Sequence, residues 1–139
     1  MVGFEIEVRT NGGRRKELFG ELSLKELVEE ALKRSSKGEE EARRFWEGFE
    51  VSEEFGRELL KLLLEEATKS LKGEGYSFFL EKWEGEVKVV CRKAVEGGEV
   101  LLKKGYPLTL YRALNANGAK GILKILETMV ESLERLRLQ

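Results

Sequence analysis

The sequence contains neither histidine nor aspartate, because all 26 of its acidic side chains are glutamates. Without these two residue types the chain has no Ser-His-Asp triad, no imidazole base, no HExxH zinc motif and no EF-hand loop. No glycine-rich phosphate loop follows a predicted strand either. These absences favour a binding protein over an enzyme, so we predict no catalytic residue, no metal ligand and no cofactor.

Cysteine and proline occur once each. Cys91 lies in an apolar run and has no second cysteine with which to form a disulfide or a CxxC motif, so we expect a buried thiol in a reducing compartment. The longest leucine cluster, residues 59–64, is interrupted by Lys61, and the N-terminus lacks the pattern of a signal peptide. We therefore expect a cytoplasmic protein without a membrane span.

Asparagine and glutamine are also scarce, with three Asn and one Gln, whereas charged residues make up 37% of the 139 residues. Depletion of amides together with enrichment in Glu, Lys and Arg is typical of hyperthermophile proteins. The length suits one domain, and 41% hydrophobic residues are enough for a core. We expect a heat-stable globular protein.

The first half of the chain begins with a strand pattern and continues with helix patterns. Residues 4–8 alternate apolar and charged side chains, and Asn11-Gly12-Gly13 supplies a turn, which predicts a hairpin returning over residues 14–19. Ser23 begins a helix through a capping box with Glu26, a second helix covers about residues 42–49, and Ser52 begins a third that ends near Gly73. Three amphipathic helices are therefore predicted after the hairpin.

The apolar period changes from about 3.6 to 2 at Tyr76. Residues 76–83, 87–95 and 100–104 are predicted strands of a meander, with turns at Glu84-Gly85 and Gly97-Gly98. Pro107 is expected to begin a helix that breaks over residues 115–118, and a last helix runs from about Ala119 to the end. The predicted fold is α+β, with a binding domain over 1–118 and an oligomerisation helix over 119–139 packed on it.

A two-residue turn at Glu84-Gly85 fixes which side chains share a face of the meander. Position 82 then opposes 87, and position 78 opposes 91, which puts Phe78, Leu80, Val87, Val89 and Cys91 on the core face. The opposite face carries two aromatics, three cations and two aliphatic side chains: Phe79, Trp83, Lys88, Val90, Arg92, Leu101 and Lys103. Aromatic rings stack on bases and cations hold phosphates, so this combination suits single-stranded nucleic acid. Alternatively, helices cover both faces, and the aromatics belong to the core.

Charge is unevenly distributed along the chain. Residues 17–86 carry nineteen acidic and eleven basic side chains, whereas residues 87–124 carry two and eight. The basic segment coincides with the meander, which favours a local basic binding surface. Arg14 and Arg15 at the hairpin tip are further candidates, as are Arg43 and Trp46 on the second helix; solvated turns and core packing are the alternatives for these residues.

The terminal helix has apolar residues at heptad spacing, namely Ile122, Leu126, Met129, Leu133 and Leu136. Its apolar stripe is wide in the first half and narrows toward the C-terminus. A wide stripe suits packing on the helix's own domain and a narrow one suits a partner helix. We predict a homodimer or higher homo-oligomer paired through this leucine-zipper-like seam, with packing inside the monomer as the alternative.

The chain resembles the ThermoDBP-type and ThermoDBP-related proteins of hyperthermophilic archaea. The parts that carry the resemblance are Phe79-Leu-Glu-Lys-Trp83, residues 88–92 and the helix from Ile122 to Leu136. The resemblance implies a compact α+β domain that binds single-stranded DNA, and in some cases RNA, and that forms oligomers through a C-terminal helix. The alternative hypothesis is a protein-interaction or scaffold module without nucleic-acid binding.

Overall fold

The computed structural model describes residue 19 and residues 23–137, and it has an α+β fold. The helices are α2 (Leu24–Ser35), α3 (Glu39–Glu47), α4 (Glu53–Leu71) and α5 (Ala116–Arg137). The strands β1 (Tyr76–Trp83), β2 (Glu86–Val95) and β3 (Gly98–Pro107) form one antiparallel sheet in that order, and the short 3₁₀ helices are η1 (Lys72–Glu74) and η2 (Leu108–Ala113). The fold class predicted from the sequence is confirmed, whereas the hairpin predicted over residues 4–19 lies, except for Phe19, outside the described residues.

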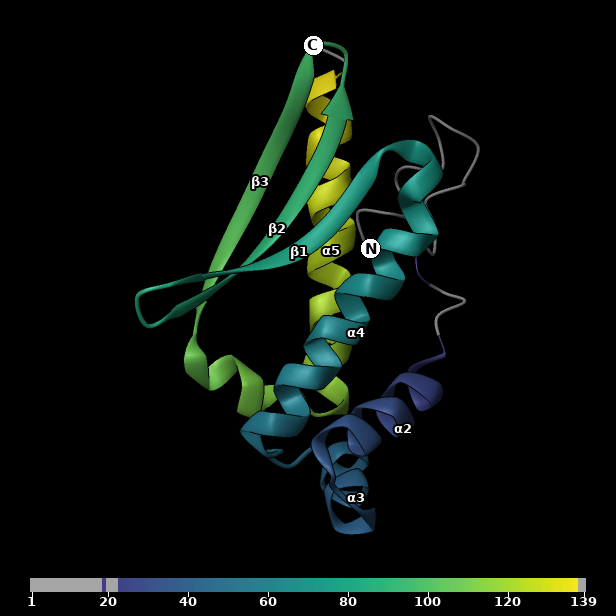
Figure 1. Ribbon diagram of the computed structural model, residues 1–139, viewed down its shortest axis with the longest axis vertical. Coiled ribbons are helices and arrows are strands. Elements are labelled where there is room, and N and C mark those ends of the chain that lie inside the picture. The colour runs from purple at the N-terminus through teal and green to yellow at the C-terminus, as the bar shows by residue number, and fades with distance from the viewer. Residues whose placement is uncertain (1–18, 20–22, 138–139) are drawn as a thin grey trace.

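The long helices α4 and α5 lie on one side of the sheet, while α2 and α3 gather at the end of α4 that is far from β1 (Figure 1). Both caps predicted from the sequence form. The Ser23 hydroxyl accepts from the Glu26 N–H at 3.4 Å, and the Ser52 hydroxyl accepts from the Phe55 N–H at 3.2 Å. These bonds satisfy amides that a helix N-terminus otherwise leaves without an intrahelical partner.

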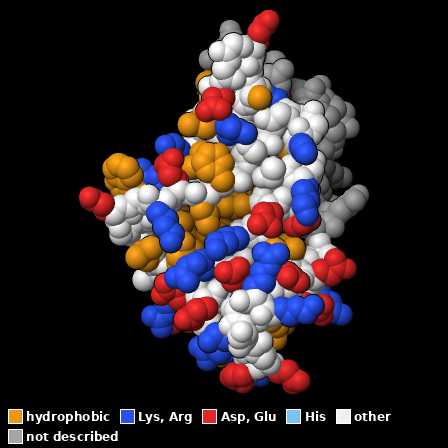
Figure 2. Space-filling model, viewed as in Figure 1, with side chains coloured by type: hydrophobic (Ala, Val, Ile, Leu, Met, Phe, Trp, Pro, Cys, Tyr) orange, Lys and Arg blue, Asp and Glu red, His pale blue; other side chains and the backbone are white. Residues whose placement is uncertain are grey.

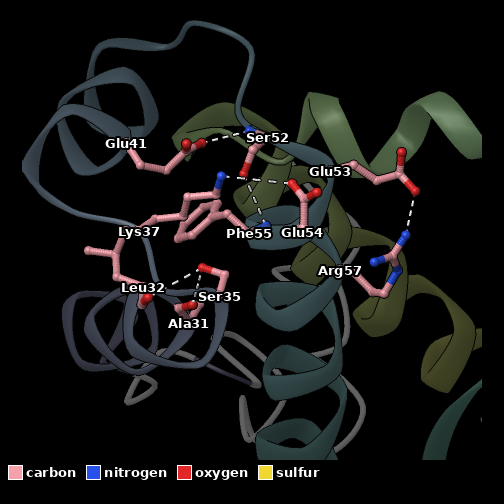
Figure 3. A network of polar contacts seen from close by, with 10 residues as sticks. All are labelled: Ala31, Leu32, Ser35, Lys37, Glu41, Ser52, Glu53, Glu54, Phe55 and Arg57. Carbon is pink, nitrogen blue, oxygen red and sulfur yellow. Dashed lines mark hydrogen bonds and ion pairs between the residues drawn. The ribbon is translucent and has the colours of Figure 1, made fainter.

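A polar network joins the three N-terminal helices (Figure 3). The Ser52 N–H donates to the Glu41 carboxylate at 2.6 Å, so α3 helps to fix the first turn of α4. Lys37, in the loop after α2, lies 4.0 Å from the Glu54 carboxylate. The helices are therefore held by side chains from their termini as well as by the apolar faces between them.

The register of β1 on β2 agrees with the prediction. Lys82 lies opposite Val87, and Phe78 lies opposite Cys91. Gly85 in the connecting turn has a φ of 67°, a conformation that glycine adopts without steric cost. The alternation of the two strands therefore places the predicted apolar set on the face that meets the helices.

The turn between β2 and β3 differs from the prediction by one residue. Val95 pairs with Gly98, so the turn residues are Glu96 and Gly97 rather than Gly97 and Gly98. Gly97 takes the positive φ, 84°, that this turn needs, and either of two neighbouring glycines satisfies that need in a sequence. Moving the turn by one residue slides β3 by two positions, so the same side chains stay on the same face.

The core lies between the sheet and the helices. The side chains of Phe78, Val87, Val89 and Cys91 point into it from the sheet and are buried. The helices contribute apolar residues from α2, α3, α4 and α5 to the same continuous cluster. Phe19 packs edge-on against Phe78 with ring centroids 6.1 Å apart.

The segment after the sheet differs from the prediction. Pro107 has extended backbone and ends β3, and the following turn, η2, is a 3₁₀ helix rather than an α-helix. Helix α5 begins at Ala116, three residues before the predicted start, because the Asn115 side chain caps it by accepting from the Gly118 N–H at 2.9 Å. The predicted break is therefore a cap, and α5 begins inside the predicted binding domain.

Candidate nucleic-acid interface

The sheet face opposite the helices carries every meander residue that the sequence assigned to it. We call it the outer face, and its side chains are Ser77, Phe79, Glu81, Trp83, Glu86, Lys88, Val90, Arg92, Ala94, Glu99, Leu101, Lys103 and Pro107. None of the described helices packs on it: Phe79 is 38% exposed, Trp83 63% and Leu101 42%. The alternative that helices cover both faces is therefore wrong for the described part of the chain.

The centre of the outer face is a cross-strand row. Val90 lies directly between Phe79 on β1 and Lys103 on β3, and it is fully buried although it does not belong to the helix-side core. Side chains directly opposite each other in an antiparallel sheet are close enough to cover one another. Phe79 therefore lies beside the buried Val90 side chain, while its own ring stays partly exposed.

The cations of the outer face are held in place by neighbours. Lys103 pairs with Glu81 at 3.0 Å, and Arg92 pairs with Glu99 at 3.5 Å. Lys88 makes no ion pair with the described residues, and its ammonium lies 5.6 Å from the centre of the Trp83 ring, within the range of a cation–π interaction. Both ion pairs are between exposed side chains, where such pairs contribute only about 0–1 kcal/mol.

Glutamates balance these cations. Lys88, Arg92 and Lys103 share the outer face with Glu81, Glu86 and Glu99. Other basic residues of the segment 87–124 lie elsewhere: Lys93 is buried on the helix side, and Arg112 pairs with Glu50 at 3.2 Å. The strongly basic character of the segment is therefore spread over several faces, and the outer face combines exposed aromatics with charges of both signs.

A groove borders the outer face where β1 meets α4. It encloses about 220 Å³ and is lined by Lys61, Leu64, Glu65, Phe78, Phe79 and Leu80. Figure 2 shows hydrophobic side chains gathered in a strip over the sheet and toward α4, with Lys and Arg side chains along its border. Phe79 belongs to both the groove and the outer face, so the two surfaces are continuous.

The sequence did not single out this groove. Leu64 reads as one more apolar residue of α4, and Lys61 and Glu65 read as solvated charges four residues apart. The groove is lined by residues of both α4 and β1, so it depends on how the two elements pack against each other. The sequence does predict that a helix is followed closely by a strand, because the apolar period changes from helical to strand spacing at Tyr76. It does not predict how the two elements pack.

The remaining predicted site residues do not join the outer face. Arg43 on α3 is bound by Glu40 at 2.6 Å and Glu47 at 2.8 Å, and its hydrogen bond lowers the pKa of the Glu40 carboxyl. Trp46 is 47% exposed on the same helix, which lies at the opposite end of the molecule from the tip of the β2–β3 hairpin (Figure 1). Arg14 and Arg15 lie outside the described residues.

Four of the five predicted seam residues of α5 are buried in the single chain. Ile122, Leu126, Met129 and Leu133 are at most 4% exposed, whereas Leu136 is 57% exposed. The apolar stripe is therefore used inside the single chain as far as Leu133, which includes part of the narrow half predicted to meet a partner helix, and of the five seam residues Leu136 alone is left exposed. Leu136 lines a second cavity of about 200 Å³ with Lys93, Val95, Val100 and Leu133, between the end of α5 and the β2–β3 hairpin.

Over residues 23–137, no group of three or more acidic or cysteine side chains is arranged to hold a metal ion. No helix in that range is long and apolar enough to cross a membrane. The chain matches no protein-family model, no curated protein and no solved structure.

Proposed function

We propose that the protein binds single-stranded nucleic acid on the outer face, with bases on Phe79 and Trp83 and phosphates on Lys88, Arg92 and Lys103. The observation that supports this most is that Phe79 and Trp83 are exposed on one sheet face. Val90, which lies opposite Phe79 on the same face, is already buried. Phe79, Trp83 and Leu101 are exposed on the same sheet face, and apolar side chains that gather on one face of a soluble protein typically mark an interaction site. Bases stack on such rings whatever their sequence.

The spacing of the rings favours an unstacked single strand. Phe79 and Trp83 are four residues apart on one strand, so they are separated by roughly 13 Å. Neighbouring bases in a duplex are about 3.4 Å apart along the axis, which is much less than the separation of the two rings. Two successive bases of a duplex therefore cannot stack on both rings. An extended strand crossing β1 places two non-adjacent bases on them.

The ion pairs set the expected salt dependence. A phosphate replaces Glu81 beside Lys103 or Glu99 beside Arg92 at little cost, because exposed pairs are weak. Three cations allow about three phosphate contacts, which for a single strand gives a slope of about −2 in the logarithm of affinity against the logarithm of salt concentration. Stacking therefore supplies most of the affinity in this proposal.

The test is a fluorescence titration of labelled single-stranded DNA, RNA and duplex DNA at two salt concentrations. Trp83→Ala is expected to weaken single-strand binding by tenfold or more, because stacking contributes about 1–3 kcal/mol per base. Trp46→Ala removes an equally large exposed ring from α3 and is the matched control, with affinity expected to stay unchanged. Circular dichroism of both variants establishes that the fold is kept.

Unchanged affinity in Trp83→Ala would contradict the stacking assignment. A wild-type protein that binds no single strand at either salt concentration would instead favour the scaffold alternative, in which the exposed apolar residues contact another protein. We also propose that the chain forms a homo-oligomer through the end of α5, where Leu136 is exposed next to Val95 and Val100.

A further inference from the structure

The groove between α4 and β1 is small and mostly apolar, as a site for a single base would be. Its volume of about 220 Å³ is below the roughly 300–1,000 Å³ of pockets that hold drug-sized ligands. Its apolar lining comes from Leu64, Phe78 and Leu80, and from Phe79, which also belongs to the outer face. A strand lying on the outer face therefore has access to the groove for a single base.

The edge of β1 supplies backbone hydrogen-bonding groups at this place. The Phe78 N–H donates to the Thr68 hydroxyl at 2.9 Å, and the Phe78 carbonyl accepts from the same hydroxyl at 3.3 Å, so both groups point away from β2. Backbone groups alternate in direction along an antiparallel strand, so those of Leu80 point to the same edge. Among the described residues, no partner outside the sheet bonds to Leu80.

The charged residues at the groove are one cation and one carboxylate from α4. Lys61 forms an ion pair with Glu58 at 3.7 Å. It lies four residues before Glu65 in α4 and forms no ion pair with it. Glu65 makes no hydrogen bond or ion pair with the described residues, although its charge acts on Arg34. An ionised carboxylate accepts hydrogen bonds with both oxygens and donates none, so it selects a ligand edge that carries donors.

We propose that this groove binds a guanine base of the single strand, with Glu65 accepting from the guanine N1–H and N2–H and Lys61 contacting the adjoining phosphate. Guanine is the base whose Watson–Crick edge places two N–H donors side by side, which matches the two oxygens of a carboxylate. Thymine and uracil present one N–H between two carbonyl oxygens, and those oxygens face a carboxylate unfavourably. This inference rests on the proposed function and adds a base preference to it.

The experiment compares four nine-nucleotide DNA strands, all thymine except for a central G, A, C or T. The wild-type protein is expected to bind the G-centred strand about tenfold more tightly than the all-T strand, as a bidentate contact to a base typically provides. Glu65→Gln, which keeps the side-chain shape, is expected to reduce this preference to below about twofold while the affinity for the all-T strand is kept. Glu66→Gln is the matched control, because Glu66 pairs with Lys69 at 3.1 Å and does not line the groove.

Three outcomes would overturn the guanine assignment while leaving the proposed function intact. These are equal wild-type affinity for all four strands, an undiminished preference in Glu65→Gln, and an equal loss of affinity for every strand in that variant. The first is also the result expected if the groove holds an extended peptide against the edge of β1. Absence of binding to any strand would overturn the proposed function itself.

Discussion

Single side chains on the outer face combine two tasks. Glu81 and Glu99 pair with Lys103 and Arg92 over the sheet, yet both pairs are exposed and weak, so in the proposed complex phosphates replace the carboxylates at little cost. Lys88 lies over the Trp83 ring, which orients both groups without a carboxylate. Because these cations already lie over the sheet, less side-chain entropy is expected to be lost in the proposed complex.

Cys91 gives a pH-dependent prediction. Burial raises the pKa of its thiol from 9.0 to about 12, against a smaller lowering effect of the Lys93 charge. The folded protein therefore keeps the thiol protonated where the unfolded chain loses the proton, so this stabilising contribution is full below about pH 9 and is lost as the pH rises toward 12. Urea unfolding of wild type and Cys91→Ala should show a difference in stability that shrinks over this range, by up to about 1.4 kcal/mol per pH unit.

A parallel loss of stability in both proteins over that range would contradict the assignment to Cys91. The same burial predicts that a thiol reagent at about pH 8 labels Cys91 only when the protein is unfolded, because the thiolate is the reactive form. Labelling of the native protein at the rate of the unfolded chain would contradict the buried position.

At the scale of elements, α4 is the helix on which the arrangement depends. It packs against β1, forms one wall of the groove and approaches η2 so closely that Gly56 touches the backbone of Tyr111. A Cβ atom at Gly56 would lie 1.8 Å from the Tyr111 carbonyl oxygen, which no local side-chain movement relieves. Position 56 therefore needs glycine because α4 and η2 pack too closely there for a side chain, and not because the chain turns.

The matched pair Gly56→Ala and Gly121→Ala tests this approach of α4 to η2. Gly56→Ala should destabilise the protein by at least about 1–3 kcal/mol through overpacking. Gly121 is an exposed α5 residue with no described atom within 4 Å of its Cβ position, so Gly121→Ala should stabilise by about 0.5–1 kcal/mol through helix propensity. Thermal unfolding measures both, and shifts of the same sign would contradict the close contact.

Elements with local signals were predictable from the sequence. Ser23 and Ser52 determine where α2 and α4 begin, and the Glu84-Gly85 turn fixes the register that places Phe79 and Trp83 on the outer face. The choice between Gly97 and Gly98 in the next turn was not predictable, because two adjacent glycines meet the same conformational need. The start of α5 was missed because Asn115 is equally suited to a break and to a cap.

The candidate site was predictable in its composition but not in its surroundings. Alternation along β1 and β2 is enough to identify the outer face, whereas the pairing of Lys103 with Glu81 depends on how three strands align. The groove depends on how α4 and β1 pack against each other. Trp46 and Arg43 were predicted to bind nucleic acid because they are close to each other in the sequence, but that closeness does not show how far they lie from the sheet. Each of these features depends on how elements that are far apart in the sequence pack together.

At the scale of the whole molecule, α5 belongs to the core of the monomer. Its buried seam residues leave Leu136, together with Val95 and Val100, as the exposed apolar surface at that end of the fold. The proposed oligomer therefore uses a small patch formed by a helix end and a hairpin, and not a long zipper.

Light scattering tests this proposal. The wild-type mass is expected to be a multiple of the 15.9 kDa chain, and Leu136→Glu is expected to give the single-chain mass because it places a charge in the patch. Leu108→Glu is the control, since Leu108 is 49% exposed on η2 and should leave the mass unchanged. A wild-type mass equal to one chain would remove the oligomer proposal and leave the outer face and the groove unaffected.

Both tryptophans lie at the surface, Trp46 on α3 and Trp83 on β1, and neither contributes to the buried core. Trp83 is 63% and Trp46 47% exposed, so both indole rings are partly hydrated in the folded state, and we expect only a modest shift of emission wavelength when the protein unfolds. The same emission is instead sensitive to whatever covers Trp83. In the proposed complex, Trp83 emission is therefore expected to report binding on the outer face more strongly than unfolding.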